Sequence, residues 1–468
     1  MKIYKSIEKN EAYLRELYKD CCDVIFRTFD IGTIRKRKCI VIYVDGICDK
    51  KYVAEGAIKH IMKSTYFGKV KKYESDKFVN DMLPISELKQ DDEFEEITNA
   101  VFFGDCIVLI EGNDKFVRLA TRWINSRAID EAKSQAAIIG SRDGFNENIR
   151  DSTSILRHKI ANPKLKFVPI TVGSETKTIV MVSYIEGICD KNLIEKVTSD
   201  IKKLKLKSVL ASGFLQKEIE KKNNSLFPSI NATERSDEAA SALLQGRVIV
   251  LIDNSPFVLM FPTTFKELIT TAEDYNESTV KRRIFIALRL VSIFCTLLLP
   301  AIYISVVEYS PEFITDKIIL FIINSRRYIP FQSFTEIILV ELIFEIIIEA
   351  GIRLPKQIGF TVGIVGSIVI GQAVVDASLV NIMVVIIVAL TAISAFVIPN
   401  YAFAVNFRVL KFVFMVVAAV GGFFGTIMCL IYTLITLCDL HPYGIEYLYP
   451  IVDSQYKFKK VLKEGGDF

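Results

Sequence analysis

Four glutamates lie inside one of the most apolar stretches of this sequence. Glu336, Glu341, Glu345 and Glu349 are embedded in the run SFTEIILVELIFEIIIEAGIR, and a nearly uncharged apolar segment follows it. Carboxylates in or beside a hydrocarbon layer are costly, and they usually face protein or water. A row of them attracts cations, as the acidic rings of cation-selective pores do. The sequence therefore predicts a membrane protein with a polar feature in its membrane half.

The spacing of these glutamates defines a helix face. Glu341, Glu345 and Glu349 repeat at i, i+4 and i+8 and so share one face, whereas Glu336 lies off this stripe. In one interpretation the stripe lines water or a polar partner inside an assembly. In a second, the helix at about 333–350 re-enters or lies at the membrane interface with the stripe solvated. A third is a soluble core helix, and the spacing leaves all three open.

The elements that must position the stripe are apolar helices in the second half of the chain. The chain divides near residue 283, since charged residues are dense before it and apolar runs dominate after it. Spanning length with few charges predicts four transmembrane helices, at about 284–307, 358–376, 382–398 and 410–437, with a turn at 377–381 and the acidic helix as a fifth element. Basic residues flank these segments in a way that satisfies the positive-inside rule for either of two topologies.

The first half carries an internal repeat. Tyr43–Lys50 reads YVDGICDK and Tyr184–Lys191 reads YIEGICDK, at an offset of 141 residues. A second pair, GDCIVLIEGND from Gly104 and GRVIVLIDNSP from Gly246, matches at an offset of 142 residues. In each copy a β-rich run, a glycine turn, a helical pattern and a second β-rich run follow one another. The repeat therefore predicts two related α/β subdomains.

Composition and motifs argue against several classes of function. Hydrophobic residues make up 51% of the chain, and the net charge of +4 is too small to indicate nucleic-acid binding. Nine irregularly spaced cysteines without a CxxC pair indicate free thiols rather than zinc sites or disulfides. The sequence shows no common enzyme motif. Asp49 and Asp190 are therefore interpreted as helix N-caps, and no catalytic residue, metal or cofactor is predicted. Because the charged N-terminus does not read as a signal peptide, we expect the first half to stay on the side where it was made.

Six blocks of the sequence carry a family resemblance. They are GSRDGFNENIRDSTSILRHKI from Gly140, LLQGRVIVLIDNSPFVLMFPTTF from Leu243, LLLPAIYISVVEY from Leu297, FEIIIEAGIRLPKQIG from Phe344, GSIVIGQAVVDASLV from Gly366 and FVIPNYAFA from Phe396. In this order they resemble the A subunits of the GerA-type nutrient receptors of bacterial spores. The sequence departs from the family pattern where IDEAKSQ replaces EPxTE, and at Ser310, Arg327 and Ile348.

The resemblance implies a germinant-sensing complex in the inner spore membrane. Within it, the A subunit works with a transporter-like, nutrient-binding B subunit and a lipoprotein C subunit. The resemblance also implies that A subunits oligomerise into a nutrient-gated, cation-conducting channel, that the soluble half faces the spore core, and that the chain is not an enzyme. The alternative is a non-conducting membrane scaffold that transduces the signal. A secondary transporter is disfavoured because no inverted repeat is visible.

These inferences predict an α/β soluble N-terminal half of two duplicated subdomains, followed by an all-α membrane domain of four to five helices. The expected segments are an N-terminal helical segment at 1–29, subdomain 1 at 30–139, a connector at 140–168, subdomain 2 at 169–283, the transmembrane domain at 284–438 and a polar tail at 439–468. The candidate residues of an ion path or its mouth are Glu341, Glu345, Glu349, Gly363, Gly366 and Gly371. The candidate structural or coupling residues are Arg353, Pro355, Gln372, Pro399 and Asn400.

Overall fold

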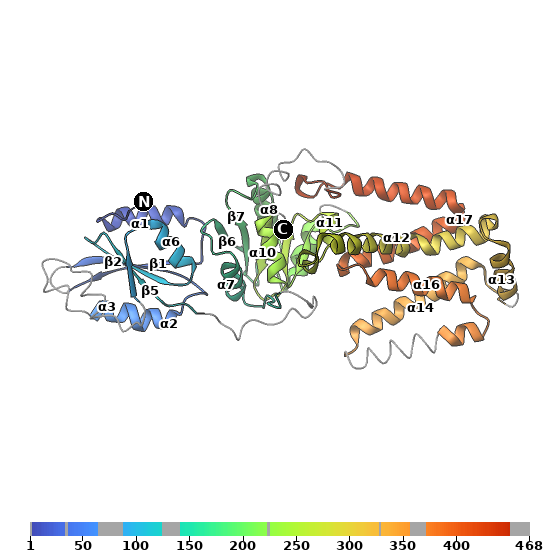
Figure 1. The fold of residues 1–468 in the computed structure, drawn as a ribbon, viewed down its shortest axis with the longest axis horizontal. Coiled ribbons are helices and arrows are strands. Elements are labelled where there is room, and N and C mark those ends of the chain that lie inside the picture. The colour runs from blue at the N-terminus through green and yellow to red at the C-terminus, as the bar shows by residue number, and fades with distance from the viewer. Residues whose placement is uncertain are drawn as a thin grey trace. The chain divides into compact units, whose positions relative to one another are not determined.

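The computed structural model forms two compact units (Figure 1). It describes residues 2–32, 36–63, 88–123, 141–221, 225–326, 329–355 and 371–449. The α/β unit consists mainly of Met1–Asn224 and Ile230–Pro262, and the helical unit consists of Ser225–Ser229 and Thr263–Ser454. The predicted fold class, an α/β half followed by a helical half, is confirmed.

The α/β unit contains two five-stranded antiparallel sheets with the same strand order, β1-β2-β4-β5-β3 and β6-β7-β9-β10-β8. The first copy consists of α1 (Ile7–Leu17), β1 (Val24–Ile31), β2 (Arg37–Val44), a helical run from α2 (Lys50–Tyr52) through η1 (Val53–Ile58) to α3 (Lys59–Lys63), β3 (Leu88–Asp91), α6 (Phe94–Phe102), β4 (Cys106–Ile110) and β5 (Phe116–Leu119). The second consists of α7 (Ile149–Lys159), β6 (Leu165–Val172), β7 (Thr178–Ile185), α8 (Lys191–Lys203), α9 (Ser212–Glu220), β8 (Asn231–Thr233), α10 (Ser236–Leu244), β9 (Val248–Ile252) and β10 (Val258–Phe261). The predicted duplication is confirmed by this shared topology.

Each copy begins with a helix that precedes its first strand. The helices α1 and α7 start at Ile7 and Ile149, which keeps the repeat offset found in the strands. Leu14 of α1 is fully buried in the apolar core of the first copy, and Leu156 of α7 is fully buried in the core of the second. The segments 1–29 and 140–168, expected from the sequence to lie outside the subdomains, thus supply core residues to them.

The turns before the central strands β4 and β9 depend on equivalent glycines. Gly104 has a φ of +95° and Gly246 has a φ of +83°. Residues that carry a side chain rarely adopt such positive φ angles. A β-carbon built at Gly104 would lie 2.7 Å from the carbonyl oxygen of Ile47, and one at Gly246 would lie 3.0 Å from that of Ile188. The same constraint therefore acts in both copies.

The predicted helix N-caps are also confirmed in both copies. The Asp49 side chain accepts hydrogen bonds from the backbone N–H groups of Lys51 and Tyr52. The Asp190 side chain accepts one from the N–H of Asn192. These bonds satisfy N–H groups that have no partner within the helix, which explains the repeated aspartates without catalysis.

One buried ion pair joins the two copies. The fully buried Arg157 of α7 donates two hydrogen bonds to Asp23, at 2.9 and 3.0 Å, and one to the carbonyl oxygen of Asn162 at 2.9 Å. Its guanidinium also lies over the rings of Phe102, from the first copy, and Phe167, from the second, at 4.6 and 4.8 Å. Removing either charge would leave the other buried without a partner, which is far more costly than losing a surface pair.

The nine cysteines of the chain are free thiols in the structure. Cys39, Cys48 and Cys106 lie in one apolar core of the first copy. Burial raises the pKa of Cys48 to about 12 and raises the pKa of Cys39 and Cys106 as well. Because the thiolate is the reactive form, these three side chains act as small core residues.

The fold predicts a large effect of Asp23→Ala on the α/β unit. The substitution leaves the Arg157 guanidinium uncompensated, and we expect a loss of about 3–5 kcal/mol of local stability. Hydrogen exchange of β1 and β6 in the full chain measures this loss. The exposed ion pair of Lys38 with Glu8 supplies the control: Glu8→Ala should leave exchange of both strands unchanged, and equal exchange in the two variants would contradict the role of Arg157.

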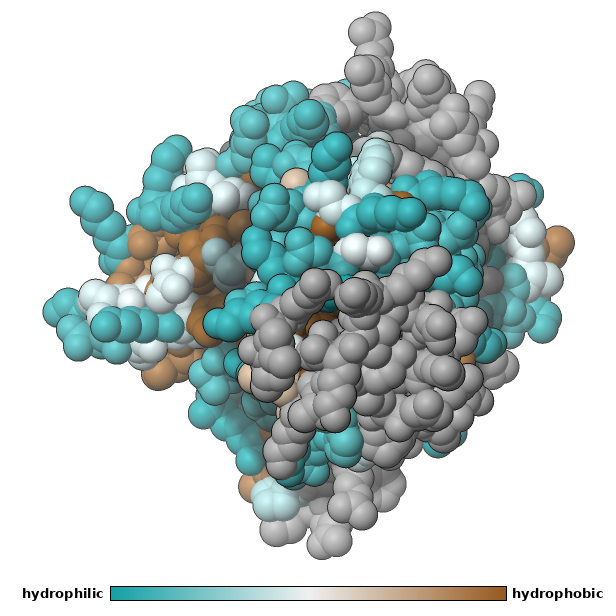
Figure 2. Space-filling view, turned by 90° about the vertical axis from the view of Figure 1, so that its left-hand side faces the viewer, coloured by the Kyte–Doolittle hydropathy of each residue, from teal (hydrophilic) through white to brown (hydrophobic). Residues whose placement is uncertain are grey.

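The helical unit contains long apolar helices. Its elements are α11 (Phe265–Ile269), η2 (Ala272–Tyr275), α12 (Thr279–Tyr309), η3 (Pro311–Phe313), α13 (Asp316–Arg326), α14 (Ser333–Arg353), α16 (Ile382–Phe396), α17 (Tyr401–Asp439) and η4 (Pro442–Gly444). Within the described part of the chain, α12 and α17 are long and apolar enough to cross a membrane, and α16 is a shorter apolar helix. The predicted turn at 377–381 is confirmed, and residues 371–376 are helical. Figure 2 shows the molecule from the left-hand side of Figure 1. On this face the described residues are mostly hydrophilic, in contrast to the exposed apolar helices.

The long helix α17 is interrupted at Gly422. This residue has a φ of 55° and a ψ of −142°, well outside the helical range. A β-carbon built at Gly425 would lie 2.8 Å from the carbonyl oxygen of Val417, a contact that a continuous helix does not make. We call residues 401–421 the first leg of α17 and residues 423–439 its second leg.

The two ends of α17 lie at the same end of the helical unit. The N–H of Phe265 donates to the carbonyl oxygen of Tyr447, beyond the second leg, at 2.7 Å. The ring of Phe265 also packs edge-on against Phe403, near the start of the first leg, with 5.6 Å between centroids. α17 is therefore a helical hairpin, and the single span predicted at 410–437 is wrong, because the glycine at its centre reverses the chain.

The apex of this hairpin packs against the end of α12. A β-carbon built at Gly422 would lie 3.0 Å from the ring of Tyr309, whose hydroxyl donates to the carbonyl oxygen of Ala419 at 2.5 Å. Below the apex, Ser305 of α12 and Thr426 of the second leg are 3.1 Å apart, oxygen to oxygen. Any side chain at position 422 would be strained, and its β-carbon would press against the Tyr309 side chain.

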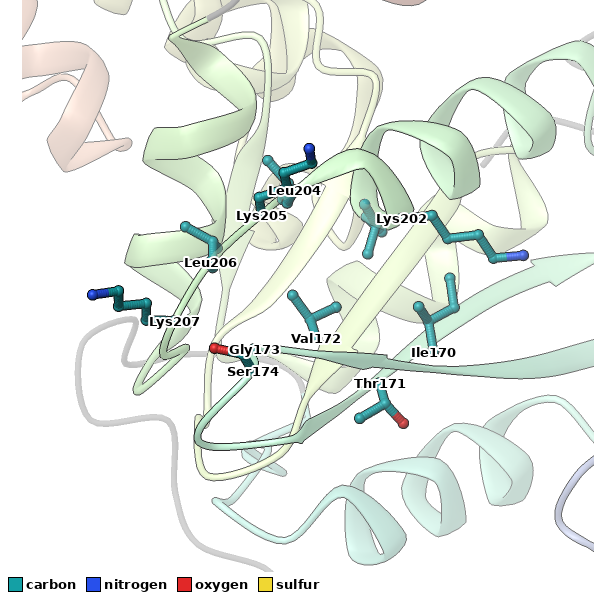
Figure 3. A pocket seen from close by; sticks show the side chains of 11 residues that line it. Ile170, Thr171, Val172, Gly173, Ser174, Lys202, Leu204, Lys205, Leu206 and Lys207 are labelled. Atoms are coloured by element: carbon teal, nitrogen blue, oxygen red, sulfur yellow. The ribbon is translucent and has the colours of Figure 1, made fainter.

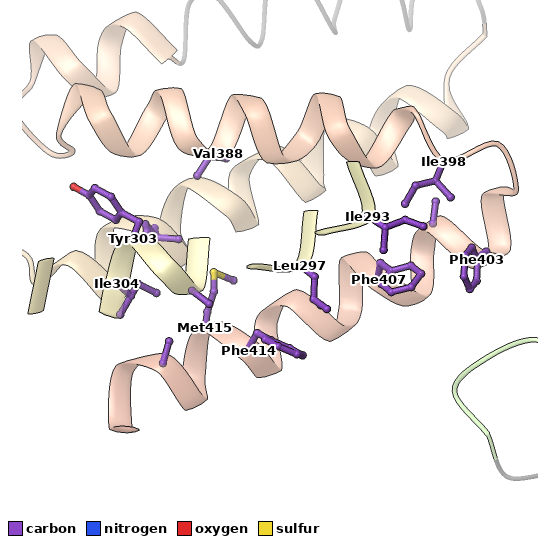
Figure 4. Close-up of a cluster of buried hydrophobic side chains, with 14 of the residues drawn as sticks. Ile293, Leu297, Tyr303, Ile304, Val388, Ile398, Phe403, Phe407, Phe414 and Met415 are labelled. Atoms are coloured by element: carbon purple, nitrogen blue, oxygen red, sulfur yellow. The ribbon is translucent and has the colours of Figure 1, made fainter. Parts of the chain in front are cut away.

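An apolar cluster holds α12, α16 and α17 together. Figure 4 shows Ile293 and Leu297 of α12 near Phe407 and Phe414 of the first leg, with Val388 projecting from α16. In the first half of α12, Arg289 pairs with Asp274, with 3.1 Å between one pair of their atoms, and donates to the carbonyl oxygen of Ile269. The only charge inside the predicted span 284–307 is thus neutralised within the unit.

The hairpin predicts that the two ends of α17 reach the same side of a membrane. Tyr401 and Cys438 are both exposed. Two variants that carry a single cysteine, one at position 401 and one at position 438, should react with a membrane-impermeant maleimide from the same side. A single straight span would expose them on opposite sides, so opposite labelling would contradict the hairpin.

Candidate functional site

The acidic helix α14 is long because its sequence contains no proline that would end it before Arg353. Its isoleucines, leucines and glutamates sustain a helix from Ser333 to Arg353. It ends where Leu354, which has extended φ and ψ, precedes Pro355, as the steric restriction before proline requires. At the other end, the N–H of Phe334 donates to Glu308 of α12 at 3.0 Å.

Two glutamates of the predicted stripe face two basic residues of the first leg of α17. Lys411 donates to Glu341 at 2.5 Å and lies 3.2 Å from Glu345. Arg408 binds both carboxylate oxygens of Glu345, and its Nε lies 3.2 Å from Oε1. We call Glu341, Glu345, Arg408 and Lys411 the charge cluster. It contains two acidic and two basic side chains, so its formal charges balance.

The charge cluster is largely buried. The side chains of Glu341 and Lys411 are 0% and 3% exposed, and those of Glu345 and Arg408 are 23% and 12% exposed. Glu341 Oε1 is buried and has no hydrogen-bond partner among the described residues. Neither Glu341 nor Glu345 is a free carboxylate in this chain.

The remaining glutamates of the acidic run lie in different surroundings. Glu349 is exposed and pairs with Arg353 one turn later, at 2.7 Å. Glu336, predicted to lie off the stripe, is buried and forms a separate group: Arg326 lies 3.0 Å away, and the N–H of Asn381 donates to it at 3.1 Å. Along the stripe, exposure therefore increases from Glu341, which is buried, to Glu349, which is exposed.

Asn381 links Glu336 to two further helices. Its side chain accepts from the N–H of Met383 and so caps α16, and it donates to Ser325 of α13 at 2.8 Å. This residue, which the sequence-based prediction did not select, joins α13, α14 and α16.

The other predicted site residues are less closely associated. Gly363 and Gly366 lie outside the described residues. Gly371 belongs to the helical residues 371–376, and a β-carbon built there would meet open space. Gln372, Pro355 and Pro399 are exposed, whereas the Asn400 side chain caps α17 by accepting from the N–H of Phe403 at 3.0 Å. The assignment of these residues to an ion path or to coupling stays a prediction.

Lys411 and Arg408, like Asn381, are not among the functional residues that the sequence predicted. Lys411 is the only charge in the apolar run 409–438, and an ionisable residue in such a run calls for a named partner. The sequence reveals Lys411 as an unusual charge, but only the folded structure shows that its partners lie on α14.

A pocket in the α/β unit is a weaker candidate site. It has a volume of about 450 Å³ and lies between the end of β6 and the loop after α8. Figure 3 shows Lys202 at the end of α8 and Lys205 and Lys207 in the loop after it, with the three side chains pointing in different directions. Because the three ammonium groups do not converge, they do not form an anion site.

Comparisons with known proteins place the chain in a family. The family model described as Bacillus/Clostridium GerA spore germination protein matches residues 12–463. The uncharacterized membrane protein YfkQ of Bacillus subtilis (strain 168) is 34% identical, over 95% of this chain and 86% of that protein.

A second relative and one solved structure are also similar to this chain. Spore germination protein KA of Bacillus subtilis (strain 168) is 32% identical, over 96% of this chain and 82% of that protein. The crystal structure of the N-terminal domain of the A subunit of the Bacillus megaterium spore germinant receptor GerK3 aligns with a TM-score of 0.45 at 22% identity, over 57% of this chain and 98% of that chain. The chain thus belongs to the Bacillus/Clostridium GerA spore germination protein family.

Proposed function

We propose that this chain is the A subunit of a spore germinant receptor and helps to initiate germination in response to a nutrient. The match of the family model over residues 12–463 carries this proposal. The subunit acts in the inner spore membrane with a transporter-like B subunit, which binds the nutrient, and a lipoprotein C subunit. Its α/β unit faces the spore core.

We further propose that copies of this subunit assemble into a nutrient-gated cation channel. The apolar helices α12 and α17 support a membrane position. The pairing of Glu341 and Glu345 with basic residues favours a position for them beside the path rather than along it. Exposed Glu349 and the segment that includes Gly363, Gly366 and Gly371 are then the better candidates for the mouth and the lining.

One observation favours a second candidate function, a non-conducting scaffold. The buried carboxylates of α14 are neutralised within a single chain, so they do not by themselves supply a row of free negative charges. A scaffold would need only the rigidity that such pairs and the apolar cluster provide.

Measurements on spores and on liposomes separate these functions. Spores that lack this chain should fail to release K⁺ in response to the nutrient that triggers the wild type, and the restored gene should recover release. Normal release without the chain would contradict a receptor role.

Reconstitution then tests conduction directly. Liposomes that contain the purified subunit with its B and C partners should show a nutrient-dependent cation flux, and omission of the A subunit should abolish it. A receptor that is required in spores but carries no flux in liposomes would support the scaffold instead.

A further inference from the structure

The charge cluster has the geometry of a clamp between two helices. Glu341 and Glu345 stand one turn apart on α14, and Arg408 and Lys411 stand about one turn apart on the first leg of α17. These spacings place each pair on one helix face, and the two faces oppose each other. Lys411 is shared, since its ammonium contacts both carboxylates.

The surroundings of the charge cluster are apolar. Val340 precedes Glu341 on α14, while Phe407 and Phe414 lie on the first leg, and all three are buried in the same apolar cluster. Lys411 Nζ also lies 5.4 Å from the ring centroid of Phe412. With little water to screen or solvate the ions, an unpaired charge at this position would be far more costly than one at the surface.

We propose that Lys411 and Arg408 are positioning residues, which use the charge cluster to clamp α14 against the first leg of α17. On this account the contribution of the acidic stripe to ion conduction is to hold α14 in place, and Glu341 is not a selectivity carboxylate. This inference rests on the proposed function, because the position of α14 matters only if the unit conducts or transmits a signal.

A pair of compensating substitutions separates the clamp from a conducting carboxylate. Either Glu341→Leu or Lys411→Met alone leaves charges in the cluster unbalanced, and nutrient-triggered K⁺ release should slow by about tenfold or more. The double variant replaces the pair with apolar side chains of similar volume, a change that buried ion pairs often tolerate. Release and the amount of receptor in the membrane should therefore return to near wild-type values.

The control is a charge change of the same type outside the charge cluster. Lys281 at the start of α12 forms an exposed pair with Glu277 at 3.0 Å. Lys281→Met should leave K⁺ release unchanged. That result would show that the loss of a lysine is not itself harmful.

A second variant covers the case in which both single substitutions prevent assembly. Exchanging the partners, as Glu345→Arg with Arg408→Glu, keeps the charge balance while it moves the carboxylate to the other helix. The exchange should restore receptor amount and release relative to Glu345→Arg alone, and the reconstituted Glu341→Leu/Lys411→Met receptor should keep the wild-type preference for cations over anions.

Three results would overturn the clamp: single variants with wild-type release, a double variant that recovers receptor amount but not release, or a double variant that loses cation preference. Each differs from failure of the proposed function, which would appear as normal K⁺ release in spores without the chain.

Discussion

The need to neutralise charge inside an apolar helical unit organises the second half of this protein. Arg289, Glu336 and the charge cluster all lie among apolar helices, and each is paired within the unit. Pairs of this kind add little net stability compared with apolar packing, but they make other arrangements of the same helices costly, because every alternative leaves an unpaired ion. The pairs thus fix which helix faces which: α14 lies against the first leg of α17, and Asn381 and Glu336 join α13, α14 and α16.

A backbone constraint at Gly422 complements these pairs. The positive φ of this residue and its contact with Tyr309 turn α17 back on itself. The return of the chain brings Tyr447 to the region of Phe265 and Phe403. The first leg also lies against α12, through the apolar cluster, and against α14, through the charge cluster. A lysine at position 411 is tolerable only in such a site, where its partners are held in place from both sides.

The sequence predicted the coarse organisation well, for identifiable reasons. The two pairs of repeated sequence blocks indicated two copies, because the capping aspartates Asp49 and Asp190 and the turn glycines Gly104 and Gly246 that they contain are structural requirements in each copy. The hydrophobic lengths located α12 and α16. Pairings between distant segments could not be obtained in this way: neither the contact of Lys411 with Glu341 nor that of Arg157 with Asp23 leaves a mark in local spacing. The hairpin in α17 was missed because the apolar length at 410–437 fits a single span, whereas the positive φ of Gly422 decides the path of the chain.

The position of Lys411 in the oligomer that we propose tests this account most directly. A structure of the membrane-embedded assembly should show Lys411 Nζ within about 3 Å of carboxylate oxygens from Glu341 and Glu345 of the same chain, a normal distance for a charge-assisted hydrogen bond. The charge cluster should then lie away from the oligomer axis. Glu341 and Glu345 facing the axis, or pairing with a neighbouring chain while Lys411 lies elsewhere, would contradict it.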